Sequence, residues 1–290
     1  MAEIIQKDGT WTFDGDTLRI VPGHDKGVGL LRRTLGELAV PLGALAGISY
    51  APGKKSGRLK LRLREGADPL LQITRGKLED GSDPYQLAVA GDRSGVAEYL
   101  VDEVRNALLL DQVPDGPVTS YLVPGPAVPI TVGAGDGTVT FDGERIRLEW
   151  NWKTEESKTS GGPRVLHLDD VEAVEWLPSA GLENGYLRFR VTKVASPPPP
   201  KYDPYAVELW GFRKDPLMAL VGAAVTARMP HPHAPQDALP AAAPATAALP
   251  TADDHDVLLR RLRELGELHQ AGILTADEFA TAKQAVLKRM

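Results

Sequence analysis

The chain contains no cysteine, which excludes disulfides, thiolate nucleophiles and cysteine-ligated zinc. It also lacks an apolar run long enough for a membrane-spanning helix: the longest, 217–227, spans eleven residues, whereas a bilayer requires roughly 20. Residues 1–8 show no basic region followed by an apolar one, the pattern of a secretory signal. We therefore expect a cytoplasmic protein that does not cross a membrane.

An excess of positive charge is also missing. The 33 Lys and Arg residues are outnumbered by 39 Asp and Glu residues, which gives a formal net charge of -6. Such a chain has no general attraction to nucleic acid or to anionic lipid, so we expect no nucleic-acid partner. Peripheral contact with a membrane would require a local basic patch.

The clearest feature of the sequence is an internal repeat. The segment DGTWTFDG at 8–15 recurs as DGTVTFDG at 136–143. The match continues through three more pairs of segments, 18–20 with 146–148, 59–63 with 187–191, and 83–85 with 203–205. The repeated unit is therefore a whole domain, and a length of 290 residues suits two of them.

Each copy has the pattern of a β-rich domain. An Asp-Gly turn between alternating segments predicts a hairpin, with Phe13 and Phe141 pointing inward. Period-two segments follow at 38–42, 46–50, 58–64, 165–168, 173–177 and 186–191.

Each copy then ends in residues at helical spacing: Val96, Leu100, Val104 and Leu108 in the first, and Leu217, Leu220, Val221, Ala224 and Val225 in the second. Asp215 and Pro216 are expected to cap the second helix and to begin its first turn. About seven strands closed by one C-terminal helix is the architecture of the pleckstrin-homology-like barrel, so the predicted fold is mainly β with two such barrels in tandem.

Composition divides the chain into five parts. The first repeat covers 1–110 and the second 130–229. They are joined by a connection at 111–129, whose five prolines prevent continuous helix or sheet. An Ala/Pro-rich segment at 230–253 is too poor in bulky apolar residues to form a core and predicts a disordered, flexible linker. Residues 254–290 form the last part.

This last part predicts a two-helix hairpin. Leucines recur at helical spacing, a glycine follows at 272, and Thr275 to Glu278 has the pattern of a capping box that begins a second helix. A hairpin of this size buries too little surface to be stable alone. We therefore expect its apolar side chains to mediate oligomerisation or docking: Leu258, Leu262, Leu265, Leu268, Ile273, Leu274, Phe279 and Val286.

Both parts resemble known families. The tail, with a leucine helix, Gly272-Ile273-Leu274-Thr275 and Glu278-Phe279, resembles the short C-terminal domain called SHOCT. Residues 3–229 resemble, in both copies, the bacterial Domain of Unknown Function 4429, which typically occurs in tandem ahead of SHOCT in actinobacterial proteins. The resemblance to SHOCT implies an oligomerisation or docking role. The tandem family implies an architecture, with no catalytic residues to carry over.

A row of cations is the best candidate for a ligand site. Lys54, Lys55, Arg58, Lys60, Arg62 and Arg64 would lie along one strand face, where several of them could bind phosphate oxygens. The alternative is the ordinary solvated face of a half-buried strand. In the second copy only Arg188 and Arg190 correspond.

Other candidates have plainer interpretations. Trp150 and Trp152 share a strand face and are candidate protein-interface aromatics, while Trp176 and Trp210 are expected in the core. The glycines of 23–33 lack the Gly-Lys-Ser/Thr ending of a phosphate loop and favour a hairpin loop. His231 and His233 lack the further ligands of a stable metal site.

No local spacing assembles a nucleophile with its base, paired acids or a metal cluster, so we expect no cofactor. The sequence favours a non-enzymatic scaffold or adaptor, whose barrels bind a protein partner and whose hairpin mediates self-association or docking. One alternative is a peripheral protein that binds phosphate or lipid headgroups through the basic strand. A second is an enzyme whose site is assembled from distant residues.

Overall fold

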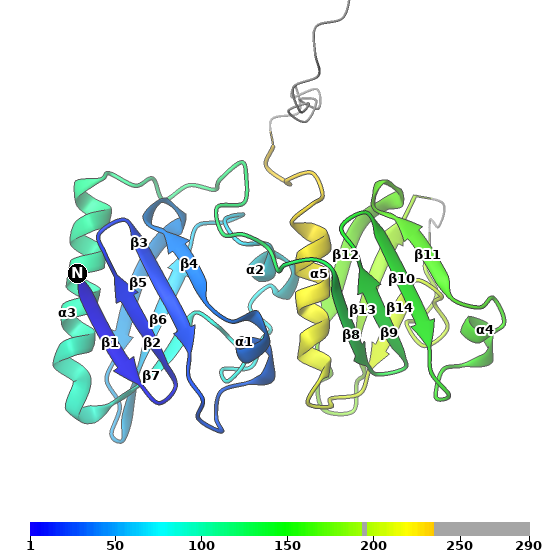
Figure 1. Ribbon diagram of the computed structural model, residues 1–290, viewed down its shortest axis with the longest axis horizontal. Coiled ribbons are helices and arrows are strands. Elements are labelled where there is room, and N and C mark those ends of the chain that lie inside the picture. Colours follow the sequence, from blue (N-terminus) through cyan, green and yellow to red (C-terminus); the bar gives the residue numbers. More distant parts are fainter. Residues whose placement is uncertain (193–195, 235–290) are drawn as a thin grey trace, which may run out of the picture. The chain divides into compact units, whose positions relative to one another are not determined.

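The computed structural model describes residues 1–192 and 196–234. The first repeat has two antiparallel sheets, a four-stranded one in the order β1-β2-β3-β4 and a three-stranded one in the order β5-β6-β7. The strands are β1 (Ala2–Gln6), β2 (Gly9–Phe13), β3 (Thr17–Pro22), β4 (Leu38–Pro41), β5 (Leu45–Ala51), β6 (Ser56–Leu63) and β7 (Gln86–Ala90). Helix α3 (Ser94–Leu110) follows and packs against β1 and β5 (Figure 1).

The second repeat has the same arrangement. One sheet has the order β11-β10-β9-β8 and the other β12-β13-β14. Its strands are β8 (Ile130–Ala134), β9 (Gly137–Phe141), β10 (Arg145–Trp150), β11 (Arg164–His167), β12 (Val171–Leu177), β13 (Gly185–Val191) and β14 (Ala206–Leu209), and helix α5 (Met218–Thr226) ends it. The fold is therefore mainly β, and over the described residues its four sheets do not close into hydrogen-bonded barrels.

The predicted hairpins are confirmed. Phe13 and Phe141 are buried, and Gly15 and Gly143 both adopt a φ of 115°, which glycine reaches without steric cost. The carboxylate of Asp14 accepts hydrogen bonds from the N–H groups of residues 16 and 17, and that of Asp142 does the same at 144 and 145. These bonds hold the pKa of each carboxyl below its ordinary value, with Thr17 and Glu144 as the main causes. The two copies therefore share the hydrogen bonds of this turn as well as its sequence.

Three short helices were not predicted: α1 (Leu30–Leu35), α2 (Pro69–Thr74) and α4 (Glu156–Thr159). The expectation of a simple hairpin loop at 23–33 is therefore wrong from Leu30 onward. Helix α2 begins at a strong local signal, because Asp68 accepts hydrogen bonds from the N–H groups of Leu70 and Leu71 and a proline occupies the first turn. Asp68 also accepts from the hydroxyl of Tyr85, 2.7 Å away.

Helix α5 is buried on every side, not along one face as its leucine spacing suggested. It packs on β12 and the first sheet of its own repeat, and α2 of the first repeat covers it from the opposite direction (Figure 1). A single hydrophobic core consequently contains Leu31, Leu70 and Ile73 together with residues of the second repeat. An uncharged helix is what such an environment requires.

The predicted cap of this helix is wrong. Residues Asp215–Leu217 form a 3-10 turn before α5, and no side chain caps it. The carboxylate of Asp215 instead accepts hydrogen bonds from three preceding N–H groups, those of Trp210, Gly211 and Phe212. It therefore shapes the loop that follows β14.

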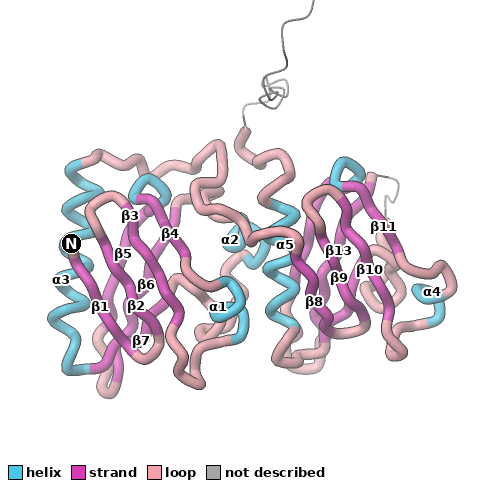
Figure 2. The backbone as a smooth tube through the Cα atoms, in the orientation of Figure 1, coloured by secondary structure: helices cyan, strands magenta, loops and turns pink. Residues whose placement is uncertain are grey.

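The connection 111–129 has no helix or strand (Figure 2). It is nevertheless packed against the first repeat. Val118 and Val123 are buried, and their N–H groups donate to the carbonyls of Glu65 and Ala67. The hydroxyl of Tyr121 donates to Gln72 Oε1 at 2.8 Å. The predicted helical hairpin at 254–290 lies outside the described residues.

Candidate interaction surfaces

The predicted basic row alternates as expected, since residues of β6 are exposed and buried in turn. Several of its cations are already engaged. Arg58 pairs with Asp80 at 2.6 Å, and Arg62 donates to the carbonyl of Ala46 at 3.1 Å. Arg64 donates to two carbonyls, of Gly43 and Gly116, and so ties the connection to the sheet. These three arginines are therefore engaged in contacts within the protein.

Three lysines of the row remain without a carboxylate within salt-bridge distance in the described part of the chain: Lys54, Lys55 and Lys60. The first two lie in the exposed β5–β6 turn and the third on β6. Lys60 lines an open cavity of about 640 Å³ with Arg62, but Asp80 and Asp83 line it too and offset their charge, whereas Lys54 and Lys55 lie in the exposed turn outside it. An anion bound there would be held mainly by screened surface attraction.

The two aromatic candidates are separated by the structure. Strand β10 ends at Trp150, so Trp152 is not on its face. Trp150 is half-buried and donates from Nε1 to the carbonyl of Gly162 at 3.1 Å. Trp152 is 89% exposed. The prediction of a shared exposed face is therefore wrong for Trp150, while Trp152 lies at the surface.

Trp152 belongs to a cluster that sequence reasoning missed. Lys153 Nζ lies 5.3 Å from the ring centroid of Trp152, 5.2 Å from that of Trp210 and 5.6 Å from that of Phe212. The rings of Trp210 and Phe212 contact edge to face with centroids 6.1 Å apart. We call Trp152, Lys153, Trp210 and Phe212 the aromatic cluster. Trp176 is buried as predicted, whereas Trp210 is only half-buried in this cluster.

Both loops that carry the cluster are fixed by hydrogen bonds. Asn151 Oδ1 accepts from the N–H of Lys153 at 2.9 Å, and its Nδ2 donates to the carbonyl of Gly135. In the other loop, the carboxylate of Asp215 accepts from the three N–H groups at 210–212 at 2.7 to 3.0 Å. Because hydrogen bonds already hold these loops in place, a partner that contacts the rings would cost little loop conformational entropy, which favours binding.

The buried charged groups have structural partners. Lys158 pairs with Asp136 at 2.6 Å, and Arg188 pairs with Asp203 at 2.8 Å. Burial raises the pKa of Asp68, which is occupied by its helix-capping bonds and by Tyr85.

The two histidines of the candidate metal pair have partners of their own. His231 Nε2 lies 3.0 Å from the carbonyl oxygen of Gly66, and its ring packs edge-on to Tyr121. His233 lies 3.6 Å from Glu65. Over residues 1–192 and 196–234, no three His, Asp or Glu side chains gather closely enough to hold a metal ion. The same residues include no helix that could span a membrane.

The comparisons with known proteins agree with the repeat. The family model described as Domain of unknown function (DUF4429) matches twice, at 11–105 and 139–226, which together exceed half of the chain. The chain therefore belongs to this family. A second model, described as Short C-terminal domain and named SHOCT, matches residues 260–287. Both predicted resemblances are confirmed. No curated protein matches the chain.

Proposed function

We propose that this protein is a non-enzymatic, cytoplasmic scaffold or adaptor in which the tandem repeats bind a protein partner and the C-terminal segment mediates oligomerisation or docking. We also propose that each repeat is a pleckstrin-homology-like domain. The pairing of a four-stranded with a three-stranded antiparallel sheet, followed by a C-terminal helix, supports that assignment. The match to the short C-terminal domain supports the role of the tail.

The observation that carries the proposal is the aromatic cluster. Trp152 is 89% exposed and Phe212 is 56% exposed, on loops held by their own hydrogen bonds. Exposed Trp side chains on rigid loops are typical anchors of protein interfaces. Lys153 within the cluster and the exposed Arg213 and Lys214 beside it favour a partner segment that combines apolar side chains with carboxylates.

The test uses the full-length chain to capture a partner, which is then purified so that its affinity can be measured directly. We expect Trp152→Ala to weaken the Kd by roughly 30-fold, the effect of losing about 2 kcal/mol at an interface anchor. The matched control is Tyr99→Ser, which removes another exposed aromatic ring from α3 of the first repeat. A purified partner that binds both variants like the wild type would contradict the proposal.

The role of the tail requires a separate measurement. Light scattering over a concentration series should give a larger mass for the full chain than for a chain that ends at Pro250, after correction for the missing residues. A full chain that is monomeric, together with a partner that binds the truncated chain equally well, would contradict an assembly or docking role.

The second candidate is a peripheral protein that binds phosphate or lipid headgroups. The lysines at 54, 55 and 60 support it, while the engagement of Arg58, Arg62 and Arg64 weakens it. Reversing the three lysine charges should abolish binding to vesicles that contain phosphatidylinositol phosphates if this candidate is right. Binding that persists would remove it.

A further inference from the structure

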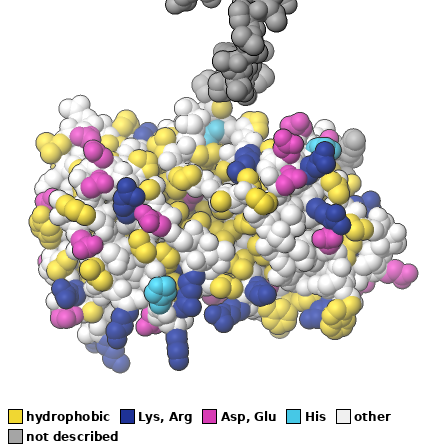
Figure 3. All heavy atoms as spheres, viewed as in Figure 1, with side chains coloured by type: hydrophobic (Ala, Val, Ile, Leu, Met, Phe, Trp, Pro, Cys, Tyr) yellow, Lys and Arg dark blue, Asp and Glu magenta, His cyan; other side chains and the backbone are white. Residues whose placement is uncertain are grey.

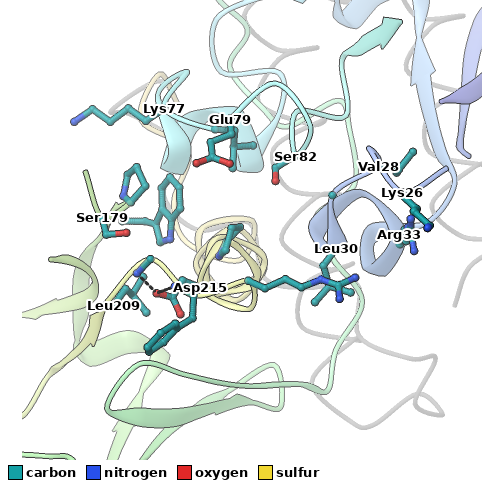
Figure 4. A pocket seen from close by; sticks show the side chains of 18 residues that line it. Lys26, Val28, Leu30, Arg33, Lys77, Glu79, Ser82, Ser179, Leu209 and Asp215 are labelled. Atoms are coloured by element: carbon teal, nitrogen blue, oxygen red, sulfur yellow. Dashed lines mark hydrogen bonds between the residues drawn. The ribbon is translucent and has the colours of Figure 1, made fainter. Parts of the chain in front are cut away.

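A cleft of about 520 Å³ lies at the junction of the two repeats (Figure 4). Its volume falls within the range of roughly 300 to 1,000 Å³ that is typical of small-molecule sites. Four segments line it: 26–33 around α1, 77–82 after α2, 176–179 at the end of β12, and 209–216 at the end of β14. Neither repeat alone forms the cleft.

About half of the wall surface of the cleft is apolar. Trp176 and Leu209 contribute buried surface from the second repeat, and Leu78 and Val28 contribute from the first. Hydrophobic side chains also gather where the repeats meet on the face shown in Figure 3. The apolar part of these walls suits the body of an organic molecule.

The charged side chains of the cleft are mostly positive. Lys26, Arg33, Lys77 and Arg213 line it, against the carboxylates of Glu79 and Asp215. Figure 4 shows Lys26 and Arg33 on one side of the cleft and Lys77 with Glu79 on the opposite side. Arg33 donates to the carbonyl of Asp25, which orients its guanidinium. Because cations outnumber carboxylates here although the whole chain is acidic, the cleft favours an anion.

Two buried polar atoms in the cleft lack hydrogen-bond partners among the described residues. One is Asp215 Oδ1, in a residue 5% exposed, since the three loop N–H groups all bond to Oδ2. The other is the indole Nε1 of Trp176, in a residue 6% exposed. An unsatisfied buried acceptor and donor each cost free energy, and because each atom exposes less than 1 Å², a bound molecule would supply the missing partners only where the side chains that line the cleft shift to expose them.

We propose that this cleft binds a small organic anion with an apolar body and a hydroxyl or amino group. The anionic group would contact cations such as Lys26 and Arg213, and the apolar body would lie against Trp176 and Leu209. After a small shift of the lining side chains, the hydroxyl or amino group would donate to Asp215 Oδ1, and an oxygen of the ligand would accept from Trp176 Nε1. This site adjoins the protein-binding surface, since Phe212 and Arg213 line the cleft, but Trp152 and Lys153 do not.

The first experiment titrates the full-length chain with 8-anilinonaphthalene-1-sulfonate, which has an aromatic body, an N–H group and a negative charge. Its uncharged analogue N-phenyl-1-naphthylamine is titrated in parallel. Fluorescence and calorimetry should show one saturable site that prefers the anionic probe by roughly tenfold or more, the effect of a few partly screened charges. Equal affinity for the two probes would overturn the proposed preference for an anion.

Variants then locate the site. Lys26→Glu/Arg213→Glu should weaken binding of the sulfonate by about tenfold or more and leave the neutral probe unchanged. The matched control is Arg93→Glu/Arg145→Glu, which changes the net charge equally at exposed positions outside the cleft. Ser179→Trp fills the cleft without changing its charge and should abolish binding of both probes. Equal losses in the test and control pairs would overturn the proposal.

A direct readout keeps the proposal testable if a variant misfolds. In a two-dimensional nitrogen-proton spectrum of the wild type, the indole signal of Trp176, assigned through Trp176→Phe, should shift on addition of the sulfonate. A spectrum in which only the exposed Trp152 indole shifts would overturn the proposal, because it would place the probe on the aromatic cluster. Trp152→Ala should leave the cleft site intact, so failure of the scaffold proposal and failure of this one are distinguishable.

Discussion

Lys158 donates from Nζ to the carboxylate of Asp136 across 2.6 Å, and the lysine side chain is completely buried. The other carboxylate oxygen of Asp136 accepts from the N–H of Glu208 in β14. The first repeat contains the same device: Arg32 of α1 pairs with Asp8 at 3.0 Å, and Asp8 accepts from the N–H of Ala88 in β7. In each copy, the Asp of the repeated Asp-Gly pair, Asp8 or Asp136, therefore connects the four-stranded sheet to the last strand of the three-stranded sheet.

This arrangement predicts that Lys158→Met or Asp136→Asn destabilises the protein by about 3 to 5 kcal/mol, because either change leaves one member of a buried ion pair without its partner. The double variant Asp136→Asn/Lys158→Met should recover a substantial part of the loss, since no uncompensated charge is then buried. Urea unfolding, followed by circular dichroism, measures the free energies of all four forms.

The pair in the first repeat provides the comparison. Asp8 is more exposed than Asp136, at 20% against 3% of its side chain. Water can therefore solvate the Asp8 carboxylate in an Arg32→Met variant, and its destabilisation should be smaller. A Lys158→Met variant that is no less stable than Arg32→Met would contradict this reading of burial.

Ile73 should stabilise the second repeat although it lies in the first. Its side chain belongs to the core around α5, where a Cβ on Gly222 would lie only 3.0 Å from Ile73 Cγ1. Ile73→Ala should cost about 2 to 4 kcal/mol by leaving a cavity. We expect the tryptophan fluorescence transition, which reports mainly on the second repeat with its four tryptophans, to move to lower urea.

Leu109→Ala is the matched control, because this leucine is 76% exposed on α3. It should change the stability by less than about 0.5 kcal/mol. If Ile73→Ala affected a separate transition of the first repeat and left the tryptophan signal unchanged, the two repeats would be independent folding units and the shared core would have no energetic role.

The strands and their faces could be predicted because they depend on local pattern. The alternation of β6 and the Asp-Gly turns of the hairpins fix which side chains point inward, irrespective of what covers them. The packing of α2 on α5 could not be predicted in this way, since an apolar face does not show which element of the fold packs against it. One signal was present: residues 217–227 carry no charge at all, which indicates a helix buried on both sides.

The aromatic cluster and the cleft were beyond sequence reasoning for a different reason. Lys153 and Phe212 are about sixty residues apart and meet only because β10 and β14 bring their following loops together. The basic row illustrates the converse. The alternation of its side chains was predicted correctly. The hydrogen bonds of Arg64 to the carbonyls of Gly43 and Gly116 were not predicted, because spacing along a strand does not reveal such partners.

Arg64 and Lys60 should therefore behave differently although they share one row. Arg64→Ala leaves two carbonyl oxygens without their charged donor and should cost about 1.5 to 3 kcal/mol. Lys60→Ala, at an exposed position, should change stability by less than about 0.5 kcal/mol. Urea midpoints measured side by side decide this. Equal effects of the two substitutions would mean that the contacts of Arg64 contribute nothing beyond an ordinary surface side chain.

Tyr121 should make the protein sensitive to alkali. Burial raises the pKa of Tyr121 from 10.0 to about 12. Because the folded state resists ionisation of this hydroxyl and the unfolded state does not, its contribution to stability is complete below pH 10 and is lost as the pH rises toward 12. Urea midpoints should fall over this interval, and the absorbance of tyrosinate at 295 nm should show a late titration step.

Tyr121→Phe tests the assignment, because it removes the ionisable hydroxyl and keeps the ring that packs on His231. The late absorbance step near pH 12 should disappear, and stability should fall less steeply with pH. Burial and the neighbouring Asp68 also raise the pKa of Tyr85, so some alkaline sensitivity should remain in the variant. A Tyr121→Phe protein with the same pH dependence and the same absorbance curve as the wild type would show that Tyr121 titrates like a solvent-exposed tyrosine.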